Sequence, residues 1–156
     1  MKILVSDPLA KPGLEILRKT KGCQIDEKPK LSPEELKKII KDYDGLIIRS
    51  GTRVTKEIIE AAENLKIIGR AGVGLDNVDL AEATKKGIIV MNTPGGNTIS
   101  TAEHAISLIL ALARNIPQAY VSLKEKKWER KKYTGVQLYG KTLGIIGMGR
   151  IGTEVA

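Results

Sequence analysis

The sequence contains no phenylalanine, one tryptophan, one histidine and one cysteine among its 156 residues. Apolar residues still make up 42% of the chain, so a core can form, but it must be packed almost entirely with aliphatic side chains. Cys23 alone can form neither an internal disulfide nor a cysteine-based metal site. A single thiol is typical of a reducing compartment, so we expect a cytoplasmic protein without a metal ion.

Apolar runs are short as well, and none approaches the roughly 18 residues that a membrane-spanning helix needs. Residues 124–132 contain six Lys or Arg and two Glu, which is half of the formal net charge of +8. Elsewhere the charges are mixed, and Trp128 is the only aromatic residue in the basic segment, too few for stacking on nucleic-acid bases. We therefore expect no membrane and no nucleic-acid partner, whereas the positive balance suits a small anionic ligand.

Strand and helix patterns alternate over the N-terminal part of the chain. The sequence predicts short apolar strands at residues 3–5, 23–25, 45–48, 65–69 and 88–91. Amphipathic helices are expected between them, at residues 12–19, after Ser32, after Thr55 and at residues 78–86. Ser32 and Glu35 form a capping box, and Asp76 is the expected N-cap of the helix at 78–86. Strands that alternate with helices predict a parallel α/β sheet, and a five-stranded flavodoxin-like sheet is the simplest one.

A turn-rich break at residues 93–97 marks a boundary between residues 1–95 and residues 96–156. Beyond it, the motif Ser100-Thr101-Ala102-Glu103 predicts a second capping box. This box opens a helix that is apolar on almost every side. A helix of this kind is expected to be buried between two bodies.

A glycine motif stands near the end of the chain. The apolar run at residues 143–146 is expected to form a strand, and the pattern G-x-G-x-x-G at residues 147–152 follows it directly. Glycines at such a position allow a tight turn and let the backbone approach a pyrophosphate at the N-terminus of the next helix. The motif alone is a weak signal, so its meaning depends on the rest of the chain.

Seven further motifs stand in a fixed order: 48–52 (IRSGT), 68–79 (IGRAGVGLDNVD), 92–97 (NTPGGN), 102–104 (AEH), 112–117 (LARNIP), 128–130 (WER) and 140–147 (GKTLGIIG). In order and spacing they resemble the D-isomer-specific 2-hydroxyacid dehydrogenases. The resemblance implies a flavodoxin-like substrate lobe in residues 1–95 and the start of a Rossmann dinucleotide-binding lobe in residues 96–156.

The resemblance also implies an activity. It points to NAD-dependent oxidation of a small anionic 2-hydroxy acid, D-3-phosphoglycerate above others, which is a step of serine synthesis. Glyoxylate or hydroxypyruvate reduction is one alternative, and a non-catalytic flavodoxin-like binding module is another. The family's catalytic arginine, glutamate and histidine and its ribose-binding aspartate would follow residue 156. No catalytic residue is therefore assigned, and residues 1–156 alone are expected to be inactive. His104 is not assigned either, because its helix is expected to be buried.

Residue roles follow from the same resemblance. Substrate binding is assigned to Arg49, Ser50, Gly72, Gly74, Asn97 and Arg130. Cofactor binding is assigned to Val73, Gly147, Gly149, Arg150, Ile151 and Gly152. From the residues alone, Arg49 could instead form a surface salt bridge, Gly72 and Gly74 could serve a turn with positive φ, and Asn97 could simply form a turn.

The basic segment has two interpretations as well. The resemblance places residues 100–138 in a subunit interface and implies a homo-oligomer, either a dimer or a tetramer. Trp128 would be largely buried in that assembly, and Arg130 would reach the substrate of the partner subunit. The alternative is a solvated basic helix with no partner.

Overall fold

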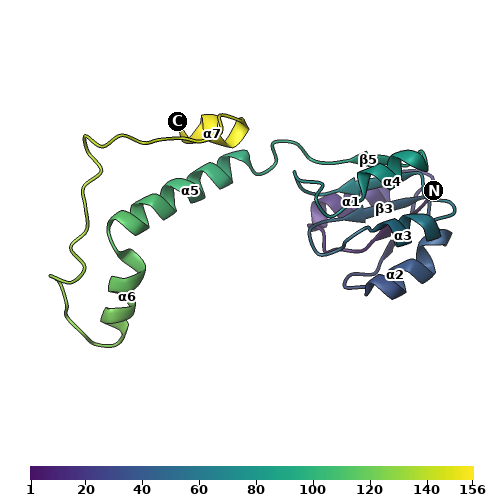
Figure 1. Ribbon diagram of the computed structural model, residues 1–156. Helices are drawn as coiled ribbons and strands as arrows, with labels where there is room; N and C mark the ends of the chain where they lie inside the picture. The colour runs from purple at the N-terminus through teal and green to yellow at the C-terminus, as the bar shows by residue number, and fades with distance from the viewer. The chain divides into compact units, whose positions relative to one another are not determined.

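The computed structural model describes all 156 residues, which divide into two compact units, Met1–Gly96 and Asn97–Ala156 (Figure 1). The first unit holds a five-stranded parallel sheet in the order β2-β1-β3-β4-β5. Its elements are β1 (Lys2–Val5), α1 (Lys11–Lys19), β2 (Gln24–Glu27), α2 (Pro33–Ile39), the 3-10 helix η1 (Ile40–Asp42), β3 (Gly45–Ile48), α3 (Lys56–Ala61), β4 (Ile67–Arg70), α4 (Leu80–Lys85) and β5 (Ile89–Met91). The predicted α/β class and its flavodoxin-like strand order are confirmed.

The core of the first unit is aliphatic, as its composition predicts. Neighbouring residues of a strand point to opposite faces of the sheet. Leu4, Leu46 and Ile68 have no exposed surface and lie on the face that α2, α3 and α4 cover. The helices contribute Leu36, Ile58, Ile59 and Ala83 to this cluster. Ile3 and Val5 of β1 are buried on the opposite face.

Tyr43 is the one aromatic residue in this core, and it carries a polar connection. Its hydroxyl donates a hydrogen bond of 2.9 Å to Asp26, and Lys2 Nζ lies 3.6 Å from the same carboxylate. This hydrogen bond lowers the pKa of Asp26. Burial, followed by the bond to Asp26, raises the pKa of Tyr43 to about 12.

A pH dependence follows from the raised pKa of Tyr43. The tyrosine binds its proton more tightly in the folded state, so its contribution to stability is complete below about pH 10 and is lost as the pH rises toward 12. Tyr43→Phe should cost about 1 kcal/mol at neutral pH, the net worth of one hydrogen bond, and should remove this component above pH 10. Thermal unfolding measured between neutral and alkaline pH tests this. If the wild type and Tyr43→Phe lost the same stability above pH 10, the prediction would be contradicted. The loss would then come from other groups, such as lysines, which titrate in the same range.

Helix starts follow local hydrogen bonding, with one correction. The predicted capping box of α2 is confirmed: Ser32 Oγ accepts from the Glu35 amide at 3.3 Å, and the Ser32 amide donates to Glu35 Oε2 at 2.8 Å. The prediction that Asp76 caps α4 is wrong, because Asp79 accepts from the Glu82 amide and α4 begins at Leu80. A parallel bridge between residues 54 and 78 holds the chain extended there, so the helix cannot begin earlier.

The second unit contains α5 (Thr98–Ala113), α6 (Ile116–Lys124) and α7 (Arg150–Val155), and α7 packs against α5 (Figure 1). The predicted capping box at Ser100 is wrong. Asn97 occupies the N-cap of α5 without a side-chain bond, and the Ser100 hydroxyl donates to the Asn97 carbonyl at 3.1 Å from inside the first turn. The strand predicted at residues 143–146 is wrong too. No strand of this unit lies beside that segment, and a strand needs a ladder partner.

The apolar helix α5 is less buried than its sequence predicts. Within this chain Ala102 is its only buried residue, whereas Leu112 is 76% exposed. The helix ends at Ala113; Asn115, with a φ of +53°, then caps α6, which has a proline in its first turn. No single helix is long and apolar enough to cross a membrane; α5 and α6 reach that length and composition only as a pair bent by 63°.

Candidate functional site

The carboxyl ends of the parallel strands meet at one edge of the first unit. Loops reach this edge at residues 6–7 after β1, 49–52 after β3, 71–76 after β4 and 92–93 after β5. Since β1 pairs with both β2 and β3, the strand order reverses between β1 and β3. In open α/β sheets ligands bind outside the carboxyl ends at such a reversal. The candidate site is therefore this edge.

The 49–52 loop is held from two sides by buried polar side chains. Asp7 Oδ2 accepts from the Arg49 amide at 2.6 Å and from the Thr52 amide at 3.0 Å. Asn77 Nδ2 donates to the carbonyl oxygens of Arg49 and Thr52, each at 2.6 Å. A Cβ atom at Gly51 would stand 2.5 Å from Asp7 Oδ1, so a larger residue there would displace the carboxylate that holds the loop. Both ends of the loop are fixed by these bonds.

The side chains of Arg49 and Ser50 are left exposed on the clamped loop. Arg49 takes part in none of the ion pairs of the first unit, so the salt bridge considered as its alternative role is not formed. An arginine in this position can bind a carboxylate or a phosphate with two parallel hydrogen bonds.

The neighbouring turn contains Gly72, Val73 and Gly74. The Asn92 side chain donates to the Val73 carbonyl at 2.6 Å, and the Thr93 amide donates to the Gly72 carbonyl at 2.9 Å. Neither glycine has a positive φ, so that alternative is wrong. A Cβ atom at position 72 would lie 2.9 Å from the Arg70 guanidinium, and one at position 74 would lie 2.8 Å from the Asp76 carboxylate, so a side chain at either position would shift these groups.

Sequence reasoning missed Arg70, which supports this turn. Its guanidinium donates to the Gly74 carbonyl and lies 3.8 Å from Asp76. The side chain is only 11% exposed, and its buried Nε has no hydrogen-bond partner. Arg70 pairs in register with Ile48, the residue before Arg49, so both arginines stand at adjacent strand ends. Position at the end of an apolar strand, the signal used for Arg49, applies equally to Arg70.

The glycine turn of the second unit has the close backbone contacts that its motif predicts. Gly147 has a φ of +98°, which favours glycine, and Gly149 precedes the first residue of α7. A Cβ atom on Gly152 would stand 2.0 Å from the Gly147 carbonyl oxygen. The first amides of α7 have no intrahelical acceptor and remain available to an anion. Arg150 and Ile151 open the helix between these glycines.

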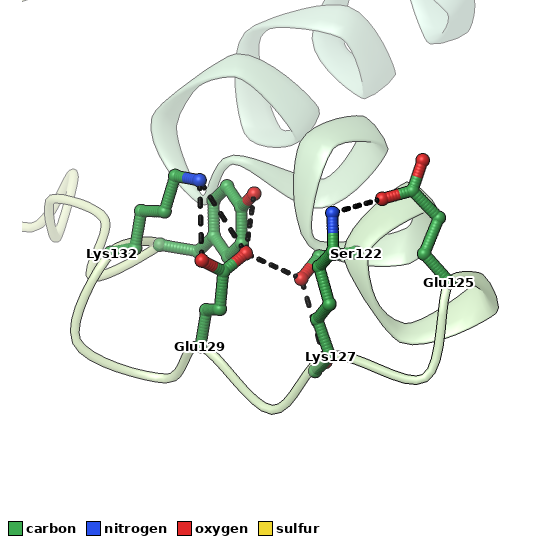
Figure 2. Close-up of polar contacts among 6 residues, drawn as sticks. Ser122, Glu125, Lys127, Glu129 and Lys132 are labelled. Atoms are coloured by element: carbon green, nitrogen blue, oxygen red, sulfur yellow. Dashed lines mark hydrogen bonds and ion pairs between the residues drawn. The ribbon is translucent and has the colours of Figure 1, made fainter.

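The segment that follows α6, residues 125–133 (the arm), folds back on that helix through Glu129 (Figure 2). The Glu129 carboxylate accepts from Ser122 Oγ at 2.9 Å and lies 3.3 Å from Lys132 Nζ. The bond from Ser122 and the nearby Lys132 lower the pKa of Glu129. Beside it lies a cavity of about 260 Å³ whose lining includes Trp128 and Arg130. Trp128 is 75% exposed in this chain, so its burial in an assembly stays a prediction.

Two other residues singled out from the sequence lie in the second unit. Asn97 is exposed at the start of α5, and His104 is exposed on the same helix. The reason for setting His104 aside, burial of its helix, therefore does not hold within this chain. The structure contains no group of three or more His, Cys, Asp or Glu side chains that could hold a metal ion.

The first unit thus combines a flavodoxin-order sheet with two arginines at its ligand edge, and the second unit contains a dinucleotide-type glycine turn. The family model of the D-isomer specific 2-hydroxyacid dehydrogenase catalytic domain matches residues 3–154. The chain therefore belongs to this family.

Relatives within the family are named more narrowly. D-3-phosphoglycerate dehydrogenase of Archaeoglobus fulgidus is 56% identical over the whole chain, which spans 29% of that relative's length. The NAD+-bound 3-phosphoglycerate dehydrogenase of Entamoeba histolytica is 36% identical with a TM-score of 0.78, over 99% of this chain and 49% of that one. The NAD-dependent formate dehydrogenase of Staphylococcus aureus, solved with NAD, is 35% identical with a TM-score of 0.87, over 100% and 52%.

Proposed function

We propose that this chain is part of an NAD-dependent enzyme that oxidises D-3-phosphoglycerate to 3-phosphohydroxypyruvate in serine synthesis. One structural observation carries the proposal: Arg49 and Ser50 stand exposed on a clamped loop at the ligand edge of a flavodoxin-like sheet. The names of the relatives support the choice of substrate, since they match over the whole chain. Because the chain spans 29% of such a relative, the activity is proposed for the complete protein.

The substrate is bound through its negative charges. Arg49 and Ser50 bind one anionic group. The turn binds the carboxylate through the amides of Val73 and Gly74, since the Gly72 amide already donates to the Arg70 carbonyl at 2.8 Å. The nearby Arg70 adds positive charge at the same edge. Asn97 is a further substrate contact, and Arg130 reaches the substrate of a partner subunit. Residues 1–95 serve as the substrate lobe in this proposal.

Residues 96–156 open the cofactor lobe. NAD supplies the hydride acceptor for C2 of the substrate. The close contact between Gly152 and Gly147 and the positive φ of Gly147 fit a turn that approaches a pyrophosphate. Gly147, Gly149, Arg150, Ile151 and Gly152 would hold that group, and Val73 would face the nicotinamide side. No residue of this chain is assigned to take the hydroxyl proton.

The complete protein is proposed to be a cytoplasmic homo-oligomer joined through residues 100–138. Supporting this, α5 carries exposed apolar residues along its length, including Leu108, Leu110 and Leu112. The arm adds Trp128, which is 75% exposed beside a cavity of about 260 Å³. Exposed apolar surface of this extent is typical of an interface.

Replacing Arg49 tests the substrate side. In the protein expressed from its complete reading frame, Arg49→Ala should raise the KM for D-3-phosphoglycerate about ten- to hundredfold, because a charge-assisted hydrogen bond is worth roughly 1.5–3 kcal/mol. The KM for NAD should stay unchanged. Arg53→Ala is the control, since Arg53 is also exposed and carries the same charge but lies outside the clamped loop. Equal changes in both KM values would point to a structural role for Arg49.

The activity itself is tested by following NADH formation from a panel of 2-hydroxy acids. The complete protein should prefer D-3-phosphoglycerate, and residues 1–156 alone should form no NADH. Preference for glycolate or D-glycerate would identify another member of the same family. NADH formation by residues 1–156 alone would show that this chain does contain the catalytic group, against the prediction.

A further inference from the structure

Two buried polar side chains at the ligand edge, Asp7 and Asn77, bind the backbone of the 49–52 loop. We propose that Asp7 and Asn77 are positioning residues that fix this loop so that Arg49 is presented to the substrate in one orientation. The inference rests on the proposed function for its kinetic consequence and on the geometry alone for its structural part. Neither residue stands in any motif position assigned to a ligand.

Asp7 holds the loop through its amides. The residue is 7% exposed, and its carboxylate forms no ion pair in the first unit. A buried carboxylate is costly unless hydrogen bonds satisfy it, and here the amides of Arg49 and Thr52 do so at 2.6 and 3.0 Å. These inward-pointing amides are thereby taken up by the protein's own anion. The amides of Arg49 and Thr52 are therefore not available to a bound substrate.

Asn77 holds the same two residues through their carbonyls. Its Nδ2 donates to the carbonyl oxygens of Arg49 and Thr52, both at 2.6 Å, and the residue is 9% exposed. In both Arg49 and Thr52, the backbone amide is thus bonded to Asp7 and the backbone carbonyl to Asn77. The backbone of Asn77 is held in turn, because its carbonyl accepts from the Val54 amide at 2.8 Å.

The clamp joins segments that are far apart in the sequence. Asp7 follows β1, the loop follows β3, and Asn77 follows β4, so the ends of three strands are tied together. A hydrogen bond of 2.9 Å between Ser6 Oγ and Thr52 Oγ1 adds a further tie. The side chain of Arg49 therefore projects from a backbone that is already fixed before the substrate binds. Preorganisation of this kind lowers the entropy that binding must still remove.

Substitutions that keep the shape of each side chain and change only its charge make the test specific. Asp7→Asn removes the charge from the acceptor, and Asn77→Asp replaces the donor by an oxygen that repels both carbonyls. In the complete protein each variant should raise the KM for D-3-phosphoglycerate about tenfold, as expected when a binding group is displaced by a fraction of an ångström. The kcat and the KM for NAD should stay unchanged, because neither residue contacts the reacting atoms.

Matched controls exist at the opposite edge of the sheet. Asp44 Oδ2 accepts from the Lys2 amide at 2.8 Å just before β3, and Asn64 Nδ2 donates to the Lys41 carbonyl at 2.7 Å. Asp44→Asn and Asn64→Asp make the same chemical changes away from the loop. They should leave the KM for substrate unchanged, whatever they do to the melting temperature. A rise in KM with both controls would mean that general destabilisation is being measured, and would overturn the positioning role.

Hydrogen exchange at the Arg49 and Thr52 amides provides a readout that needs no activity. Exchange should be slow in the wild type and at least about tenfold faster in Asp7→Asn, because a lost protecting bond opens the loop. Unchanged exchange in both loop variants would overturn the clamp. Faster exchange with an unchanged KM for substrate would overturn its role in positioning Arg49. Should the wild type oxidise no 2-hydroxy acid, the proposed function fails, while the exchange rates still decide whether the loop is clamped.

Discussion

Gly152→Ala should weaken NAD binding by the complete protein about ten- to hundredfold, because overpacking against a rigid neighbour costs roughly 1–3 kcal/mol. The added Cβ would stand 2.0 Å from the Gly147 carbonyl oxygen and 3.1 Å from its carbon. Both are backbone atoms of the glycine turn, so neither can rotate away. The helix α7 must then move relative to the turn, and the amides proposed to meet the pyrophosphate move with it.

Gly144→Ala is the control for this prediction. A Cβ atom at Gly144 would meet nothing within 4 Å, although the residue lies only a few positions upstream of the turn. Titration of each variant with NAD, followed calorimetrically, gives the two dissociation constants. An unchanged affinity in Gly152→Ala, or the same loss in Gly144→Ala, would remove the glycine turn from the cofactor site.

Leu112→Glu should convert the proposed oligomer into monomers. Leu112 is 76% exposed in this chain, so a glutamate there costs a single subunit little. In an apolar interface the same carboxylate would be buried without a partner, and we expect the dissociation constant of the assembly to rise at least about a hundredfold.

Ile16→Glu provides a matched change on α1, where Ile16 is 69% exposed in the first unit. Sedimentation equilibrium of both variants beside the parent protein measures the effect. The Ile16 variant should keep the parent's mass. A Leu112 variant that also keeps it, at every concentration, would exclude α5 from the subunit interface.

The fold could be predicted from the sequence because the strands are buried and the helices between them are amphipathic. The strand predicted at residues 45–48 has the same bounds in the structure. A central strand covered by helices is a continuous apolar run, so its ends are marked by the change to polar residues. Pairing partners are not visible in a local pattern. The run at residues 143–146 has the same apolar character but no neighbouring strand in its unit, and it forms none.

The candidate site was predictable only in its exposed part. Arg49 is found because it directly follows an apolar strand, where ligands bind in parallel sheets. Asp7 and Asn77 contact it from 42 and 28 residues away, and nothing in their own neighbourhoods marks that contact. Gly72 and Gly74 are recognised as special, yet the positive φ considered for them is absent, and their neighbours Arg70 and Asp76 become visible only in the folded chain.

The central claim is that the carboxyl edge around the 49–52 loop receives the anionic substrate. A crystal structure of the complete protein with D-3-phosphoglycerate tests it most directly. We predict an anionic oxygen of the substrate within hydrogen-bond distance of the Arg49 guanidinium, with Asp7 and Asn77 still bound to the loop as they are here. Substrate bound with no contact to Arg49, Ser50 or the turn at Gly72 and Gly74 would contradict the account.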